Sequence, residues 1–259
     1  MERQDLFSVK DRIVLVTGAS YGLGVRFAQV MALGGAKVAC CARSMDKLQS
    51  VVKEIQRQGG NAIAVLMDMA DRSSIRSAFD TIEKEFNGPV NVLINNAGMF
   101  DGASAERMTE EQWDTTFKVN TTGPFVAAQE CARRLIAKKQ PGSIINITSI
   151  AAHLTKPGRV NYSASKSALE AMTRSLALDW AKFGIRVNAI SPGFLATPMS
   201  APFEQTEEGR REIANLPIGR YARPDELDGP ILLLASDASS YMSGSVITVD
   251  FAHSVCLFK

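Results

Sequence analysis

The sequence predicts an α/β protein built on one doubly wound parallel sheet of about seven strands, flanked by helices on both faces. Short unbroken apolar runs, such as residues 12–17, have the pattern of strands that are buried on both faces of a parallel sheet. Amphipathic stretches separate these runs at a regular rhythm, which is typical of right-handed β–α–β crossovers. The length of 259 residues suits a single domain, residues 1–259, better than two small ones.

Most apolar runs are followed by a stretch with helical periodicity, and glycine or proline marks most boundaries. Thr109 and Gln112 have the spacing of a capping box, and Gly123-Pro124 predicts a kink in the helix that follows. Residues 194–223 have weak periodicity, which predicts a mobile insertion on the substrate side. Strands are expected at residues 12–17, 37–42, 61–67, 90–95, 142–149, 185–190 and 246–249. Helices are expected from the first glycine turn to about residue 33 and at residues 44–58, 71–86, 109–138, 161–183 and 224–235.

The first strand runs into a glycine-rich turn, Gly18-Ala19-Ser20-Tyr21-Gly22-Leu23-Gly24, that opens a helix. Glycines let the backbone approach a pyrophosphate closely, and a helix N-terminus offers it free N–H groups and a positive dipole end. This order predicts a dinucleotide-binding half over about residues 10–100. The spacing Gly-x-x-x-Gly-x-Gly departs from the Gly-x-Gly-x-x-Gly fingerprint, and a tight turn without a ligand is the alternative.

Tyr162 and Lys166 are four residues apart in an expected helix, so their side chains lie on one helix face. An ammonium close to a phenol lowers the pKa of the phenol, which makes it usable for proton transfer. Ser149 closes the fifth apolar run, which places it at the carboxyl end of a strand, where open parallel sheets bind ligands. The alternative is an ordinary amphipathic surface pair.

Composition and charge argue against several classes of function. The formal net charge is +2 and no basic run is present, so nucleic-acid binding has no support. The sequence contains no apolar stretch of the kind found in signal peptides or membrane spans. The four cysteines lack a Cys-x-x-Cys spacing and the histidines are only His153 and His253, so no metal site is expected. These features predict a reduced, cytoplasmic protein without a membrane partner.

Several short motifs occur in a fixed order on the expected elements. They are residues 17–24, Asp68, Asn95-Asn96-Ala97-Gly98, Asn120, Ser149, Tyr162-x-x-x-Lys166, and Pro192-Gly193 with Thr197. In these motifs the chain resembles the short-chain dehydrogenase/reductase family over nearly its whole length, and that family has the glycine spacing seen here. The resemblance implies a Rossmann-type sheet with strand order 3-2-1-4-5-6-7, a nicotinamide dinucleotide, and hydride exchange between a ketone and a secondary alcohol.

The resemblance assigns the chemistry to four residues. Tyr162 is expected to be the general acid/base, while Lys166 lowers its pKa and holds the nicotinamide ribose. Ser149 is expected to hydrogen-bond the substrate oxygen as charge develops on it. Asn120 resembles an asparagine at a helix break whose backbone positions a water that links Lys166 to solvent. Relief of a helix kink is the alternative for Asn120.

The same resemblance assigns the cofactor contacts. Asp68 is expected at the adenine edge, Asn96 along the ribose and Thr197 at the nicotinamide half, while Asn95 is expected to tie neighbouring strands together. The expected set is Gly18, Ser20, Tyr21, Gly22, Leu23, Gly24, Arg43, Ser44, Asp68, Met69, Asn96, Ala97, Gly98, Tyr162, Lys166, Pro192, Gly193, Leu195 and Thr197.

Arg43 favours NADP over NAD as the cofactor. An NAD site places a carboxylate about twenty residues past the glycines, and here that position is Ala42, followed by Arg43. A guanidinium can bind a 2′-phosphate through two parallel hydrogen bonds. Against this, Tyr21 stands where family members committed to NADP often have a basic residue, and Arg43 stacked on adenine is compatible with NAD.

The substrate pocket is expected between the loop after the fifth strand and the 194–223 segment. His153 is explained equally well as a residue that faces substrate and as a loop histidine. The candidate lining is mostly apolar, which predicts a substrate with a hydrophobic arm, and consists of Phe100, His153, Leu154, Phe194, Met199 and Phe203.

Three other functions remain as alternatives. A 3-oxoacyl-thioester reductase needs a basic surface for an acidic carrier, and a basic group is present at Arg133, Arg134, Lys138 and Lys139, although a solvated helix face explains it as well. A sugar-acid dehydrogenase is disfavoured by the apolar lining. A non-catalytic module that senses the cofactor is disfavoured because the serine, tyrosine and lysine are all present.

The C-terminus departs from the family pattern. Asp250-Phe251-Ala252-His253 stands where family members usually have Asp-Gly-Gly, and the tail after it is apolar. We expect this tail to pack across a subunit interface or beside a neighbouring active site. By analogy with the family, the long helices around Asn120 and Tyr162 predict a homotetramer.

Overall fold

The computed structural model describes residues 6–197 and 200–256. Within these residues seven parallel strands form one sheet in the order β3-β2-β1-β4-β5-β6-β7, which confirms the expected fold class and strand order. The strands are β1 (Ile13–Thr17), β2 (Lys37–Ala42), β3 (Asn61–Leu66), β4 (Val92–Asn95), β5 (Gly142–Ile147), β6 (Ile185–Pro192) and β7 (Val246–Val249).

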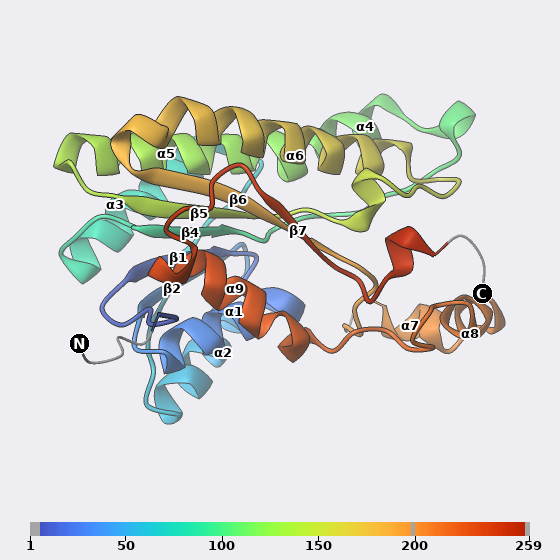
Figure 1. Cartoon of the computed structure of the whole chain (residues 1–259), viewed down its shortest axis with the longest axis horizontal. Coiled ribbons are helices and arrows are strands. Elements are labelled where there is room, and N and C mark those ends of the chain that lie inside the picture. The colour runs from blue at the N-terminus through green and yellow to red at the C-terminus, as the bar shows by residue number, and fades with distance from the viewer. Residues whose placement is uncertain (1–5, 198–199, 257–259) are drawn as a thin grey trace.

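Helices cover both faces of this sheet (Figure 1). One face carries α3 (Arg72–Phe86), α5 (Gly123–Lys138) and α6 (Val160–Trp180), and the other carries α1 (Gly22–Leu33), α2 (Met45–Arg57) and α9 (Asp228–Ala235). The remaining helices are α4 (Glu110–Phe117), α7 (Ala201–Glu204) and α8 (Glu207–Ala214), with α7 and α8 beyond one end of the sheet.

The 194–223 segment is more regular than the sequence predicted. It contains α7 and α8, and a bridge between Leu195 and Ala222 joins its two ends. Both helices are too short to give a clear helical period, which explains why periodicity did not reveal them.

The two faces of the sheet have separate hydrophobic cores, because side chains alternate along each strand. On β1, Val14 and Val16 belong to the core that includes residues of α1, α2 and α9, whereas Leu15 belongs to the core that includes residues of α3 and α5. All five residues of β1 are buried. The unbroken apolar run that predicted this strand therefore reflects a sheet covered on both faces.

The helix expected over residues 109–138 is interrupted just before the predicted kink. At its start, Thr109 and Gln112 form the expected capping box, with Gln112 N donating to Thr109 Oγ1 at 3.2 Å. The interruption is a π-helical turn, Lys118–Thr122, and α5 then begins with Gly123 and Pro124. Proline suits a first turn because its missing N–H would have no partner there, so this pair restarts the helix.

After β7 the backbone turns through two residues with left-handed conformations. Phe251 has φ of +49° and Ala252 has φ of +66°. This region favours glycine, because a Cβ approaches the backbone closely there. The positions at which the family pattern has glycine thus adopt glycine-like conformations while carrying side chains.

Candidate active site

The candidate catalytic side chains meet at the carboxyl end of β5. Ser149 follows this strand, and its Oγ accepts a hydrogen bond from Ala151 N at 3.1 Å. Tyr162 lies in the first turn of α6, and Lys166 follows one turn later on the same helix face. Lys166 Nζ is 5.7 Å from the centre of the Tyr162 ring, and the Ser149 hydroxyl lies close enough to the phenol to lower its pKa. The structure therefore brings the serine, the tyrosine and the lysine together.

Lys166 is a buried cation with a backbone partner. Its side chain is only 4% exposed, and Nζ donates to Ile147 O at 2.9 Å. Gly98 lies beside the ammonium, since a Cβ at that position would be 3.4 Å from Nζ, in ordinary contact. Burial lowers the pKa of Lys166 to about 8. The lysine is therefore mostly charged at pH 7 and loses its proton in a mildly alkaline solution.

The pKa of Tyr162 moves in the direction opposite to the expected one. Burial raises it, while the Ser149 hydroxyl and the positive charge of Arg159 lower it by less. Lys166 directs its ammonium at the Ile147 carbonyl and is not among the groups that shift this pKa. The cost of burying a phenolate therefore outweighs the favourable charges around Tyr162.

Asn120, in the π-helical turn, holds the loop after β4 against α6. Its Oδ1 accepts a hydrogen bond from Met99 N at 2.8 Å, and its Nδ2 donates to Met99 O at 2.9 Å and to Ser165 Oγ at 3.1 Å. The side chain is fully buried and its polar atoms are occupied. Asn120 thus fixes the backbone beside the lysine, and the positioning of a water by its own backbone stays a prediction.

Two glycines of the turn, Gly18 and Gly24, pack too closely against the loop after β4 to carry a side chain. Gly18 and Gly22 have φ of +68° and +60°, a region that favours glycine. A Cβ on Gly24 would lie 2.6 Å from Asn96 Nδ2 and would also collide with the carbonyl of the first glycine. Asn96 Nδ2 donates to Thr17 O at 2.9 Å, which ties the two loops together.

The N-terminus of α1 is open to an anion. Tyr21 occupies the N-cap position without a capping hydrogen bond, and the first turn contains no acidic residue. Uncapped N–H groups and the positive end of the helix dipole favour a phosphate. The glycine turn of residues 18–24 therefore forms a cradle which, together with this helix end, fits the pyrophosphate of a dinucleotide.

Phe100 packs against Tyr162, and a second aromatic group forms around Phe194. Phe100, in the loop after β4, meets the Tyr162 ring edge-on, with 5.6 Å between ring centres. Phe194, which follows β6, packs against Tyr221 at 5.5 Å and edge-on against His253 at 4.9 Å. Phe100 therefore lies next to the phenol, and Phe194 belongs to a second aromatic group.

A cation that the sequence analysis missed lies between two of these rings. The guanidinium of Arg159 is 5.4 Å from the centre of the Phe100 ring and 6.0 Å from that of Phe194. Lys156 approaches Phe194 as well, but its ammonium is paired with Glu212. The site is thus less apolar than the sequence predicted. The only sequence signal for Arg159 was its place three residues before Tyr162.

The structure describes three of the other expected pocket residues, His153, Leu154 and Phe203. His153 Nε2 is 2.9 Å from Glu170 Oε2, so its ring faces α6 instead of the aromatic group. Leu154 is exposed, Phe203 is half-buried on α7, and Met199 lies outside the described residues. Among the described residues of the expected lining, Phe100 contacts Tyr162, and Phe194 is linked to Phe100 through Arg159.

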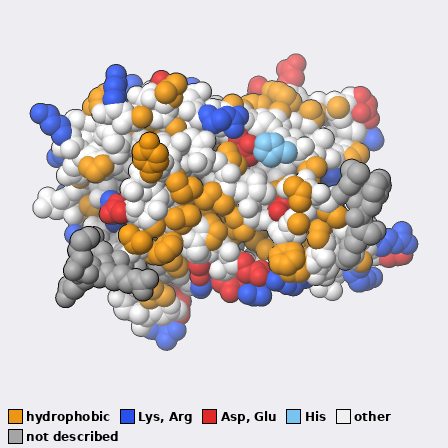
Figure 2. All heavy atoms as spheres, viewed as in Figure 1, with side chains coloured by type: hydrophobic (Ala, Val, Ile, Leu, Met, Phe, Trp, Pro, Cys, Tyr) orange, Lys and Arg blue, Asp and Glu red, His pale blue; other side chains and the backbone are white. Residues whose placement is uncertain are grey.

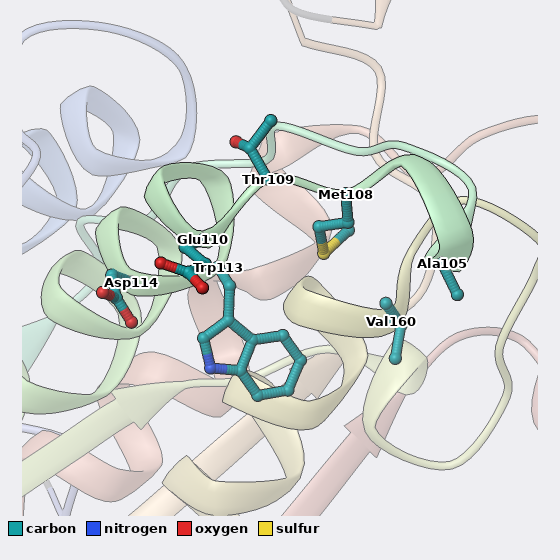
Figure 3. Close-up of a pocket in the computed structure, with 7 residues that line it drawn as sticks. All are labelled: Ala105, Met108, Thr109, Glu110, Trp113, Asp114 and Val160. Carbon is teal, nitrogen blue, oxygen red and sulfur yellow. The ribbon is translucent and has the colours of Figure 1, made fainter.

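A separate hollow of about 450 Å³ lies beside the start of α6, and Figure 3 shows the Trp113 indole extending across it. Its lining does not include the serine, tyrosine or lysine described above. It is lined by Ala105, Met108, Thr109, Glu110, Trp113, Asp114 and Val160. The hollow is therefore distinct from the candidate active site.

Comparisons with known proteins identify the family to which the chain belongs. A family model described as Enoyl-(Acyl carrier protein) reductase matches residues 18–251. A short-chain type dehydrogenase/reductase from Mycobacterium marinum superposes with a TM-score of 0.91 at 35% identity, covering 96% of this chain and 98% of that chain. The chain belongs to the short-chain dehydrogenase/reductase family.

Two further members of the family are similar over nearly their full lengths. The chain is 37% identical over 244 residues to the 3-oxoacyl-(acyl-carrier-protein) reductase FabG of Thermotoga maritima, covering 93% of this chain and 97% of the relative. The crystal structure of a gluconate 5-dehydrogenase from Burkholderia cenocepacia in complex with NADP and tartrate superposes with a TM-score of 0.92 at 30% identity, covering 98% and 99% of the two chains.

As a member of this family, the chain is an NAD(P)-dependent oxidoreductase that acts on CH–OH groups. The expectation that Asn95 ties strands together is confirmed, since its Nδ2 donates to Asn146 Oδ1 at 2.9 Å across β4 and β5. In the described part of the chain, no helix has the length and apolar character that a membrane span requires. The same residues contain no cluster of three or more His, Cys, Asp or Glu side chains suited to a metal ion.

Three residues lie where the adenosine end of the cofactor is expected. Arg43 is the first of them, and it is exposed directly after β2. No acidic side chain pairs with it in the residues that the structure describes. Ser44, the N-cap residue of α2, makes no capping hydrogen bond through its side chain. Asp68 Oδ1 accepts a hydrogen bond from Ala70 N at 2.9 Å, which fixes the carboxylate after β3.

Proposed function

We propose that this short-chain dehydrogenase/reductase interconverts a ketone and a secondary alcohol with Tyr162 as its general acid/base. The convergence of Ser149, Tyr162 and Lys166 at the carboxyl end of β5 carries the proposal. The glycine cradle lies within the same network, because Asn96 contacts it and Gly98, two residues later, approaches the lysine. A dinucleotide on the cradle would therefore reach the reacting groups.

The roles of the three residues follow from their contacts. A bound nicotinamide dinucleotide supplies or accepts the hydride. Ser149 Oγ donates a hydrogen bond to the substrate oxygen and holds it against the phenol. Tyr162, whose pKa is raised by burial, keeps its proton at neutral pH and can donate it to that oxygen during reduction. Lys166, whose ammonium is anchored at the Ile147 carbonyl, would hold the nicotinamide ribose of the bound dinucleotide.

We include a preference for NADP in the proposal. Arg43 is exposed and without an acidic partner at the end of β2, and Ala42 replaces the carboxylate that binds an NAD ribose. Ser44 adds a hydroxyl that is free of a capping bond. A related gluconate 5-dehydrogenase has been crystallised in complex with NADP, which supports the same choice.

Steady-state kinetics with NADPH and NADH test this proposal on a panel of ketones. Arg43→Ala is expected to lower kcat/KM for NADPH by roughly ten- to a hundredfold, because charge-assisted hydrogen bonds to the phosphate are lost, and to leave NADH almost unaffected. Arg57→Ala, at the far end of α2, removes the same charge and should change neither value. A strong preference of the unmodified enzyme for NADH would refute the argument from Arg43.

Reduction of 3-oxoacyl thioesters is a weaker candidate. The basic group that favoured it is partly neutralised, because Arg134 pairs with Asp80 at 2.7 Å and with Glu83 at 2.9 Å. Arg133 lies 3.7 Å from Glu130 on the same helix. The similarity to FabG keeps this activity among the substrates worth testing.

A homotetramer is also part of the proposal. Figure 2 shows apolar side chains gathered over the middle of one face, where α9 and the edge strand β7 lie in Figure 1. Leu232, Leu233, Ile247 and Val249 are only half-buried in the single chain, and a second copy would cover them. Val255 of the tail is 81% exposed, while residues 257–259 lie outside the described part. Packing of the tail across an interface therefore stays a prediction, and light scattering that returned one 28.0 kDa chain would contradict assembly.

A cytoplasmic location completes the proposal. All four cysteines are free thiols, and Cys40, Cys41 and Cys131 are buried. Such thiols persist in a reducing compartment.

A further inference from the structure

Arg159 occupies a place in the site that the proposed function does not use. It is the N-cap residue of α6, and its carbonyl accepts a hydrogen bond from Ser163 N at 2.8 Å. The guanidinium lies against the rings of Phe100 and Phe194, at 5.4 and 6.0 Å from their centres. Phe100 in turn meets Tyr162 edge-on. Rings from two separate loops thus hold this cation on the substrate side of the phenol.

The charge of Arg159 has no partner in the described part of the chain. Its N–H groups make no hydrogen bond there, and no carboxylate lies within ion-pair distance. Asp101, beside Phe100 in sequence, accepts a hydrogen bond from a glutamine side chain at 3.1 Å. Glu212 is paired with Lys156 and accepts a hydrogen bond from Tyr221 at 3.2 Å. These two acidic groups therefore already have partners, and the positive charge of Arg159 is not neutralised by either of them.

The unpaired charge acts on the reacting group. Arg159 lowers the pKa of Tyr162 and also that of Tyr221, against the larger effect of burial. Its field therefore reaches from the catalytic phenol to the ring that packs on Phe194. Consider a ligand whose carbonyl oxygen lies at Tyr162. A group of that ligand a few bonds away from the carbonyl would then lie next to the Arg159 guanidinium.

The geometry around Arg159 fits a carboxylate. A guanidinium is planar and offers paired donors that match the two oxygens of a carboxylate. Flanking rings also remove water from part of the site, which strengthens an ion pair made there. A neutral ligand would leave the cation without a counter-charge in that partly apolar setting.

We propose that Arg159 binds the carboxylate of the substrate, so that the enzyme interconverts short oxo acids and the corresponding hydroxy acids. This proposal rests on the proposed function, since it places the carbonyl of the same substrate at Tyr162. It assigns specificity for a negative charge to a residue outside the serine–tyrosine–lysine group, whereas the sequence predicted only a substrate with a hydrophobic arm.

Paired probes test the proposal, namely 2-oxo-, 4-oxo- and 5-oxohexanoate with their methyl esters. Each is assayed for NADPH oxidation and, by calorimetry, for binding to the enzyme saturated with NADP⁺. The unmodified enzyme is expected to prefer at least one acid to its ester by about tenfold or more. Arg159→Met should lower kcat/KM for that acid by roughly ten- to a hundredfold, mainly through KM, and should change the ester by less than about threefold.

Two further variants separate charge from fold. Arg159→Lys keeps the charge without the paired donors and should recover part of the loss. Arg174→Met removes an exposed cation from the same helix and should leave both probes unaffected. Thermal unfolding of each variant shows whether the fold is intact.

The possible outcomes distinguish this proposal from the one on which it rests. Turnover of esters equal to that of acids, together with an Arg159→Met variant that behaves like the unmodified enzyme, would overturn the carboxylate site and leave the proposed function standing. Binding of an acid that depends on Arg159, without turnover of any probe, would support the site and count against the proposed reaction. Absence of both binding and turnover of all acids would overturn the carboxylate site.

Discussion

The free energy of unfolding is expected to rise with pH in alkaline solution, and replacing Lys166 by methionine is expected to remove this rise. Burial lowers the pKa of this lysine from 10.5 to about 8 in the folded protein. Between these two values the unfolded chain binds a proton that the folded chain does not, so the free energy of unfolding increases with pH. One pKa unit corresponds to about 1.4 kcal/mol, so the full rise is about 3 kcal/mol. Below pH 8 the folded protein bears the whole cost of the buried ammonium.

Urea unfolding without cofactor, at intervals from pH 7 to pH 11, measures this effect as the difference between the unmodified protein and Lys166→Met. Subtraction removes other titrations, such as those of the buried cysteines, because both proteins share them. Lys53→Met, on the exposed side of α2, is the matched control and should give a flat difference. Parallel curves for the unmodified protein and Lys166→Met would refute the argument from burial.

Two other substitutions test the backbone of the cofactor and C-terminal turns. Ala252→Gly should raise the free energy of unfolding by up to about 1 kcal/mol, because Ala252 has φ of +66°, a conformation that glycine adopts without strain. Urea unfolding measures this change, and a loss of stability would show that no strain is stored at this residue. Gly24→Ala should lower the free energy of unfolding by about 1–3 kcal/mol, since the new Cβ would lie 2.6 Å from Asn96 Nδ2. It should also weaken the binding of NADPH in a fluorescence titration. Unchanged affinity and stability would show that the turn has room to adjust.

The fold could be predicted from the sequence because its signals are local. The apolar runs gave all seven strands found in the described residues, since a strand covered on both faces has apolar side chains on both. The capping box at Thr109 and Gln112 also depends only on neighbouring residues. The meeting of Tyr162 and Lys166 needed only the helical period and the place of Ser149 after a strand.

The remaining features depend on contacts between distant segments. Arg159 became visible only when the loops of Phe100 and Phe194 were brought around it. The pKa of Tyr162 could not be predicted because its direction is set by burial, which a sequence pattern does not report. At Phe251 and Ala252 the sequence showed the departure from glycine, but only the structure showed that the left-handed conformations persist.

The most direct test of the account is single-turnover oxidation of NADPH by Tyr162→Phe with a ketone that the unmodified enzyme reduces. The substitution removes the phenolic proton and little else, so turnover should fall by roughly a hundred- to ten-thousandfold. The affinity for NADPH should stay within about twofold, because the glycine cradle is untouched. A variant that kept more than about a tenth of the normal rate would contradict a role for Tyr162 in proton transfer.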